Sequence, residues 1–190
     1  MTTPGKSPAA PSKVSTPTDR EIRVERVFNA PRERVWQAFT DPKLVAQWWG
    51  RGNKLVIERM EVERGGHWRY VEHSAGGVHG FEGRYREVTP PERIVFTFEW
   101  DGMPGYVAVE TATFEDLGDG RTKVVTTALF HTTAERDGML KSGMEQGLNE
   151  SYSALDKLLD NLGGKRTAAA ARGGGGGLER SLDTLSLAAC

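Results

Sequence analysis

Length, composition and charge exclude several classes of protein for this chain of 190 residues. Its formal net charge of −1 gives no electrostatic reason to expect nucleic-acid binding, and no stretch approaches the roughly twenty apolar residues of a membrane span. The single cysteine, Cys190, is the last residue, so neither an internal disulfide nor a cysteine-based metal site is possible. No secretory signal is recognisable, and we expect a cytoplasmic protein.

The start of the chain differs from its middle. Residues 1–19 are rich in proline and contain one large aliphatic residue, Val14, which is too little apolar surface to offset the entropy of ordering. We therefore predict a disordered segment there. All aromatic residues lie between Phe28 and Tyr152, and the predicted domain spans residues 20–162.

A strand and two short helices are predicted first. Apolar side chains alternate with charged ones across residues 21–28, which is the pattern of a strand with one solvent-facing side. Two helix starts follow, at residues 29–31 (NAP) and 41–42 (DP). Each places a capping side chain beside a proline whose fixed φ suits the first helical turn.

From residue 54 onward the hydrophobic period changes to two, with Gly and Pro turns between the segments. Six further strands are predicted, at residues 54–63, 67–73, 78–88, 93–100, 106–114 and 123–131. Short turns between successive strands favour hairpins, so we predict one antiparallel sheet of about seven strands.

Residues 132–162 predict a long amphipathic helix that the sheet curves around. Thr132 and Glu135 have capping-box spacing, and the pair at 163–164 (GG) is the expected stop. Gly143 and Gly147 lie near the edge of the apolar stripe, which suggests room for a strand, a loop or a ligand. Because helices flank a run of strands, the predicted class is α+β.

The remaining residues predict two segments beyond the domain. Residues 163–177 have the composition of a flexible Ala/Gly-rich linker. The last segment, residues 178–190, has leucines at helix-like spacing: Leu178, Leu182, Leu185 and Leu187. It is either a docking or targeting peptide for a protein partner, with spacing similar to a leucine-rich nuclear export signal, or a non-native or disordered extension.

Several sequence strings together resemble one superfamily. They are residues 27–36 (VFNAPRERVW), 40–42 (TDP), 48–49 (WW), 65–68 (GGHW), 83–85 (GRY), 87–95 (EVTPPERIV) and 143–152 (GMEQGLNESY). The chain is similar to the SRPBCC or START-like superfamily, and most to the bacterial branch related to the C-terminal domain of the heat-shock-protein-90 ATPase activators (AHSA-type). This resemblance implies a helix-grip fold, in which an antiparallel sheet grips the C-terminal helix around a hydrophobic cavity.

Members of this superfamily include lipid-transfer domains, pollen allergens, aromatic polyketide cyclases and chaperone activators, so the fold does not choose the function. We expect binding of a small hydrophobic or amphipathic molecule. The predicted cavity wall comprises Trp48, Trp49, Trp68, Tyr70, Tyr85, Phe96, Phe98, Trp100, Met144, Leu148 and Tyr152. Such aromatic rows also occur as ordinary core, and aromatic side chains that carry a polar atom can orient a ligand.

Two alternatives remain open. A cyclase-like or hydrolase-like enzyme could use the same cavity, with His131, Tyr85 or Glu110 as acid or base, although no nucleophile motif is present. Thr111, Thr113 and Thr127 are further polar candidates on the late strands. The other alternative is a chaperone-interaction module. We expect no cofactor and no metal, because His67, His73 and His79 lack a carboxylate at ligand spacing.

Overall fold

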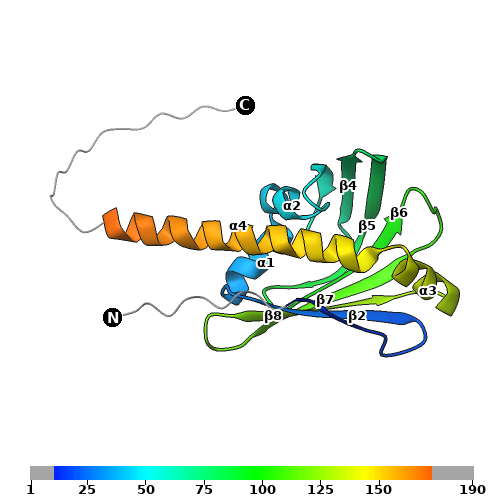
Figure 1. Cartoon of the computed structure of the whole chain (residues 1–190), viewed down its shortest axis with the longest axis horizontal. Coiled ribbons are helices and arrows are strands. Elements are labelled where there is room, and N and C mark those ends of the chain that lie inside the picture. The colour runs from blue at the N-terminus through cyan, green and yellow to red at the C-terminus, as the bar shows by residue number, and fades with distance from the viewer. Residues whose placement is uncertain (1–10, 173–190) are drawn as a thin grey trace.

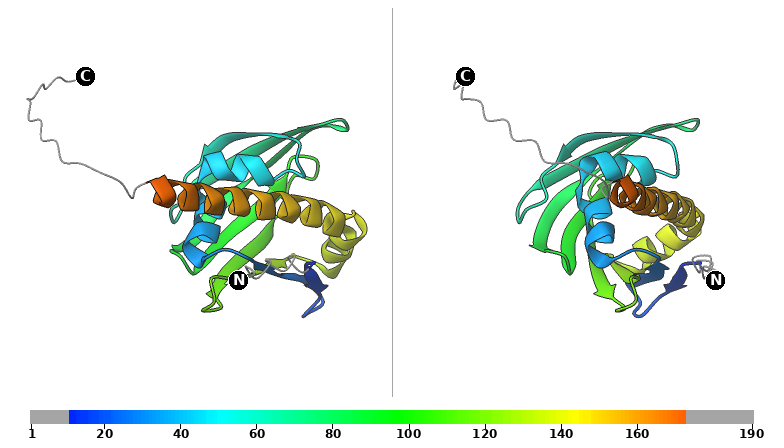
Figure 2. Two further views of the ribbon diagram at one scale, coloured as in Figure 1. Left: turned by 60° about the vertical axis from the view of Figure 1, so that its left-hand side comes forward. Right: turned by 90° about the vertical axis from the view of Figure 1, so that its left-hand side faces the viewer.

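The computed structural model describes residues 11–172, with side chains as far as Gly164. One open antiparallel sheet of eight strands curves around a long C-terminal helix (Figures 1 and 2). The strands are β1 (Lys13–Ser15), β2 (Glu21–Phe28), β3 (Lys54–Met60), β4 (His67–Ser74), β5 (Gly77–Thr89), β6 (Arg93–Trp100), β7 (Ala108–Asp116) and β8 (Thr122–Leu129). The helices are α1 (Arg32–Thr40), α2 (Pro42–Trp48), α3 (Thr133–Lys141) and α4 (Met144–Arg172). The predicted α+β class and helix-grip architecture are confirmed.

The spatial order of the strands is β1-β2-β8-β7-β6-β5-β4-β3. Chain neighbours pair as hairpins from β3 to β8, whereas β2 joins β8 across the whole length of the domain. The two helices inserted after β2 lie beside α4, as Figure 1 shows. Their junction is the predicted one, because Asp41 Oδ1 accepts a hydrogen bond of 2.8 Å from the backbone N–H of Lys43 and Pro42 opens α2.

One end of the domain is packed tightly. We call it the packed end and define it by the fully buried Phe28, Val35, Val45 and Leu155, which come from β2, α1, α2 and α4. Edge-to-face ring contacts surround them, such as Phe28 against Tyr152 with centroids 5.3 Å apart. This end fixes α4 against the two short helices.

The predicted disordered segment 1–19 is wrong in part. Residues 13–15 form β1, an additional edge strand with Val14 opposite Val24 of β2. The sequence shows too few apolar residues for a strand here, but an edge strand takes much of its stability from backbone hydrogen bonds, which any sequence can make. Residues 1–10 lie outside the described part of the chain.

The predicted single helix 132–162 is wrong at both its continuity and its end. Gly143 has a φ of 80°, which breaks the segment into α3 and α4, and Leu140 is 37% exposed rather than part of a buried stripe. The helix also continues through Gly163 and Gly164 to Arg172, because a run of four alanines (168–171) follows with high helix propensity. The first part of the predicted linker is therefore helical, and the tail leucines lie outside the described residues.

The N-cap of α3 at Thr132 is confirmed, but the reciprocal bond of the predicted capping box goes to His131 instead of Thr132. The backbone N–H of Glu135 donates to Thr132 Oγ1 at 3.2 Å, and the Glu135 carboxylate accepts from the backbone of His131. Within residues 11–172, no helix is both long and apolar enough to cross a membrane.

Candidate functional site

The inner face of the sheet becomes less tightly covered away from the packed end. There the first turns of α4 lie over the ends of β6, β7 and β8, as the two views of Figure 2 indicate. We call this region the half-buried end and define it by Phe96, Phe98, Glu110, Met144 and Leu148, none of which is fully buried. Met144, Leu148, Phe96 and Phe98 pack against the core yet keep part of their surface accessible to solvent.

Strand register decides which side chains share this face. Glu110 of β7 lies opposite Phe96 of β6 on one side and Ala128 of β8 on the other. Two residues away along β7 on the same face are Ala108 and Ala112, both buried. Three of the four nearest inner-face neighbours of Glu110 are therefore alanines, whose side chains are single methyl groups.

The Glu110 carboxylate has no hydrogen bond or ion pair with any residue whose side chain is described. Its position on the inner face removes part of its hydration, and this desolvation raises the pKa of Glu110 from its ordinary value of 4.5 to about 7. The other acid on this face, Glu72, accepts a hydrogen bond from the side-chain amide of Asn53. Glu110 is thus a carboxyl that changes charge near neutral pH without a partner from the protein.

The nearest buried cation on the inner face is already engaged. Arg26 of β2 forms an ion pair with Asp156 of α4, and its guanidinium lies 5.5 Å from the ring centroid of Phe28 and 5.7 Å from that of Tyr152. Its charge is therefore held at the packed end.

Buried phenol groups also line the inner face. Tyr152 hydrogen-bonds with the Thr126 side chain, and burial raises the pKa of Tyr152 to about 12. Tyr70 and Tyr85 interact through their hydroxyl groups, and burial raises the pKa of Tyr85 to about 12 and that of Tyr70 well above its ordinary value. All three stay neutral at physiological pH, so each can act as a hydrogen-bond donor.

The aromatic residues of the predicted wall form one cluster on β4, β5 and β6. Trp68 lies 4.8 Å from Tyr70, 5.9 Å from Phe96 and 6.0 Å from Phe98, measured between ring centroids. Its indole N–H donates to the backbone carbonyl of Thr97 at 3.2 Å. Trp49 joins the same cluster, with its ring 5.0 Å from that of Phe81.

Other predicted residues lie elsewhere. Trp48 belongs to the core near the packed end, where its indole N–H donates to the carbonyl of Ala38 at 2.8 Å. Trp100 lies at the end of β6, where it lines a recess on the outside of the sheet together with His79; their ring centroids are 6.0 Å apart. His131 lies before α3 and is exposed, whereas Tyr85 is buried.

The threonines named from the sequence are on the wrong face. Thr111 lies opposite Thr127, and Thr113 opposite Val125, one residue out of phase with Glu110 and Ala112. The inward hydroxyl is that of Thr126, which the sequence analysis missed. The signal was the alternation of Ala108, Glu110 and Ala112, which fixes the parity of β7 and hence of β8.

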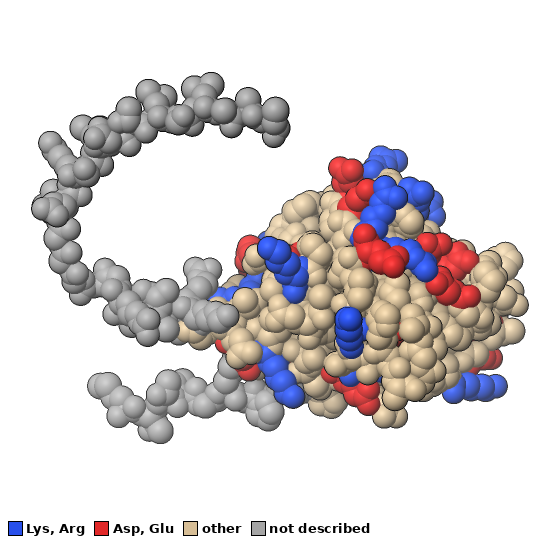
Figure 3. Space-filling view, turned by 90° about the horizontal axis from the view of Figure 1, so that it is seen from above, with Lys and Arg blue, Asp and Glu red and all other residues tan. Residues whose placement is uncertain are grey.

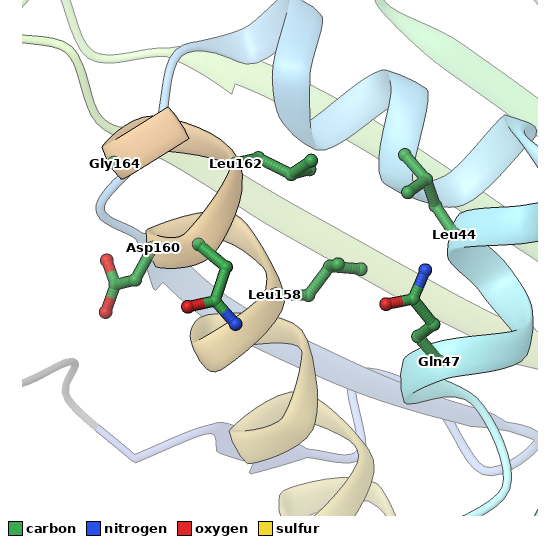
Figure 4. Close-up of a pocket in the computed structure, with 7 residues that line it drawn as sticks. Leu44, Gln47, Leu158, Asp160, Leu162 and Gly164 are labelled. Atoms are coloured by element: carbon green, nitrogen blue, oxygen red, sulfur yellow. The ribbon is translucent and has the colours of Figure 1, made fainter. Parts of the chain in front are cut away.

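The two best-formed recesses in the described part of the structure are not lined by Glu110, Met144 or Leu148. The first, of about 540 Å³, lies between α2 and the later turns of α4 (Figure 4). We call it the helix groove; its lining is Leu44, Gln47, Leu158, Asp160, Asn161, Leu162 and Gly164. The predicted internal cavity is therefore not among the recesses described.

The second recess, of about 480 Å³, we call the outer recess. Its lining is Glu58, Arg69, Val71, Val78, His79, Gly80, Trp100, Asp101 and Gly102. Arg69 forms ion pairs there with Glu58 at 3.2 Å and Asp101 at 2.7 Å, and a further one with Glu82 at 3.3 Å. Because these charges satisfy one another near water, we assign them a structural role.

Charge and metal-ligand groups do not mark another site. On the face seen in Figure 3, Lys and Arg are interleaved with Asp and Glu rather than gathered by sign. Among the residues with described side chains, no three His, Cys, Asp or Glu groups come together as they would around a metal ion. His67 instead lies 3.5 Å from the Glu82 carboxylate.

Comparison with known proteins places this geometry in a family. The family described as "Activator of Hsp90 ATPase homolog 1-like protein" matches residues 29–160. A crystal structure from Chromobacterium violaceum is 30% identical, with a TM-score of 0.63 over 73% of this chain and 96% of that one. A crystal structure from Rhodobacter sphaeroides is 25% identical, with a TM-score of 0.73 over 80% of this chain and 99% of that one.

DynU16, a protein in the dynemicin biosynthetic locus, shares the fold, with 24% identity and a TM-score of 0.59 over 75% of this chain and 48% of that one. A search of curated proteins gives no match. The match to the family covers most of the chain and includes β3 to β8, both short helices and the start of α4. The chain therefore belongs to the Activator of Hsp90 ATPase homolog 1-like family.

Proposed function

We propose that the protein binds a small apolar or amphipathic molecule at the half-buried end, between the sheet and the first turns of α4. The observation that carries this proposal is the retained exposure of Phe96, Phe98, Met144 and Leu148, which face the interior of the domain. Apolar surface that stays wet inside a fold gains free energy when a ligand covers it. The aromatic cluster supplies the flat apolar area that such a molecule would cover.

The test is a titration with an uncharged apolar fluorescent probe, N-phenyl-1-naphthylamine, followed by fluorescence and by the melting temperature. Met144→Asp puts a charge at the half-buried end and should weaken probe binding at least about tenfold, since an unpaired buried charge costs several kcal/mol. Val78→Asp is the matched control, because Val78 is 63% exposed and lines the outer recess.

The two variants separate the possible binding sites. Binding that survives Val78→Asp and is lost in Met144→Asp supports the proposal. Binding that survives Met144→Asp and is lost in Val78→Asp would indicate a site in the outer recess instead. A probe that binds neither the wild type nor any variant would contradict a binding role.

A second candidate is an acid–base enzyme that uses the same region. It is favoured by Glu110, because a carboxyl with a pKa of about 7 and no protein partner suits proton transfer at neutral pH. Tyr85 lies on the same inner face, whereas the exposed His131 has no comparable place. Turnover that Glu110→Gln abolishes while probe binding stays unchanged would distinguish this enzyme from a binding protein.

The family description supports a third role, as a chaperone-interaction module. Such a role would act through the outer surface. It predicts that the protein co-purifies with an Hsp90-type chaperone and that Met144→Asp leaves this association unchanged.

A further inference from the structure

The feature that carries a further inference is the missing counter-charge of Glu110. Glu110 lies on the inner face between Phe96 and Ala128, and among the described residues no cation or donor pairs with its half-buried carboxylate. Arg26 faces Asp156, the hydroxyl of Tyr152 bonds with Thr126, and that of Tyr85 bonds with Tyr70. At pH 8 an ionised carboxylate that has lost part of its hydration without gaining a partner destabilises the fold. Pairing with an opposite charge offsets this loss of hydration free energy.

The residues around Glu110 have short or aromatic side chains, which suit a cation. Ala108, Ala112 and Ala128 are its short neighbours, while Phe96 presents an aromatic ring from the opposite strand. Aromatic faces attract cations through their quadrupole, most strongly where water is excluded. The half-buried Phe98 and Leu148 extend the apolar surface away from the carboxylate.

We propose that the molecule bound at the half-buried end is a cationic amphiphile, whose protonated amine pairs with the Glu110 carboxylate and whose apolar body covers Phe96, Phe98 and Leu148. This inference rests on the proposed function and names the chemical class of its ligand. It requires no reaction: the amine keeps its proton and the carboxylate accepts a charge-assisted hydrogen bond.

The experiment uses three ligands that share one apolar body: 2-naphthylmethylamine, 2-naphthylmethanol and 2-naphthoate. Their affinities for the full chain are measured by calorimetry at pH 8, where Glu110 is ionised and the amine is still largely protonated. We expect the amine to bind about ten to a hundred times more tightly than the alcohol, which is the range for a hydrogen bond to a charged group. The naphthoate should bind most weakly because it places a second negative charge beside Glu110.

Two variants assign the preference to one residue. Glu110→Gln keeps the shape of the side chain and should bring the affinities of amine and alcohol to within about threefold, because only the charge is removed. Glu115→Gln is the matched control, since Glu115 lies on the same strand but is exposed on the other face. It should keep the full preference for the amine, and near-ultraviolet circular dichroism checks that both variants are folded.

The results separate this inference from the proposed function. Equal binding of amine and alcohol, or tightest binding of the naphthoate, would overturn the cationic ligand and leave the binding role standing. A preference for the amine that persists in Glu110→Gln would overturn the role of Glu110. Failure of all three ligands to bind would overturn both proposals.

Discussion

The packed end and the half-buried end use the same sheet and the same helix in different ways. At the packed end, large side chains from four elements fill the interior, with Phe28, Val35 and Leu155 fully buried. At the half-buried end, alanines and an unpaired carboxyl lie beneath the start of α4, and the aromatic residues keep part of their exposure. The difference indicates that one end supplies stability, while the other carries a charge and exposed apolar area that reduce stability, and it is there that we propose the ligand binds.

The largest effect should come from removing a side chain of the packed end. Leu155→Ala leaves a cavity among residues that cannot readily collapse, so the free energy of unfolding should fall by about 2–5 kcal/mol. Leu148→Ala, on the same helix but half-buried, should cost less than about 1.5 kcal/mol because solvent already reaches the site. Urea denaturation measures both. Equal losses would mean that the two ends are packed alike.

Replacing Glu110 should instead raise the free energy of unfolding at neutral and higher pH. The pKa of about 7 in the folded protein exceeds the ordinary value of 4.5, so between these values the folded state holds more proton than the unfolded state. Stability should therefore decline as the pH rises through this window, with the full cost present above pH 7. A shift of one pKa unit corresponds to about 1.4 kcal/mol, so the shift of Glu110 makes the cost at most about 3.5 kcal/mol.

Glu110→Gln removes this cost, so the variant should be more stable than the wild type at pH 8 and close to it at pH 4. Glu115→Gln provides the surface comparison. Urea midpoints across this pH range are the measurement, and a wild-type stability that rises between pH 5 and 7 relative to Glu110→Gln would contradict a desolvated carboxyl.

The smallest effect concerns the hinge between α3 and α4. Gly143→Ala forces a side chain onto a φ of 80° and should cost about 1–2 kcal/mol. Gly138→Ala, inside α3 with open space around it, should instead stabilise by up to about 1 kcal/mol. Thermal unfolding of the two variants tests whether the break in the helix is required. Similar melting temperatures would indicate one continuous helix in solution.

Local patterns predicted much of the fold. The alternation in residues 21–28 and 93–100 gave the bounds of β2 and β6 without error, and the Asp41-Pro42 and Thr132-Glu135 pairs marked two helix starts correctly. These features depend on side chains within a few residues of one another. The sequence can therefore reveal them without knowledge of the tertiary structure.

The sequence-based predictions differed from the structure where residues distant in sequence determine the local structure. β1 forms by pairing with the backbone of β2, which composition does not reveal. Of the three occupants expected beside Gly147, the structure has the loop: the guanidine Nε of Arg51, in the turn between α2 and β3, lies 2.8 Å from where a β-carbon would stand. Likewise the core position of Trp48 follows from its bond to Ala38, and the inward face of Thr126 from the register between β7 and β8.

The most direct test of the account is chemical-shift mapping of the full chain during titration with 2-naphthylmethylamine. Saturable shifts concentrated at Phe96, Phe98, Glu110, Met144 and Leu148, with little change at Phe28, Val35 and Leu155, are the predicted result. Shifts confined to the outer recess around Val78 and His79, or to the helix groove around Leu44 and Leu162, would contradict a binding site at the half-buried end.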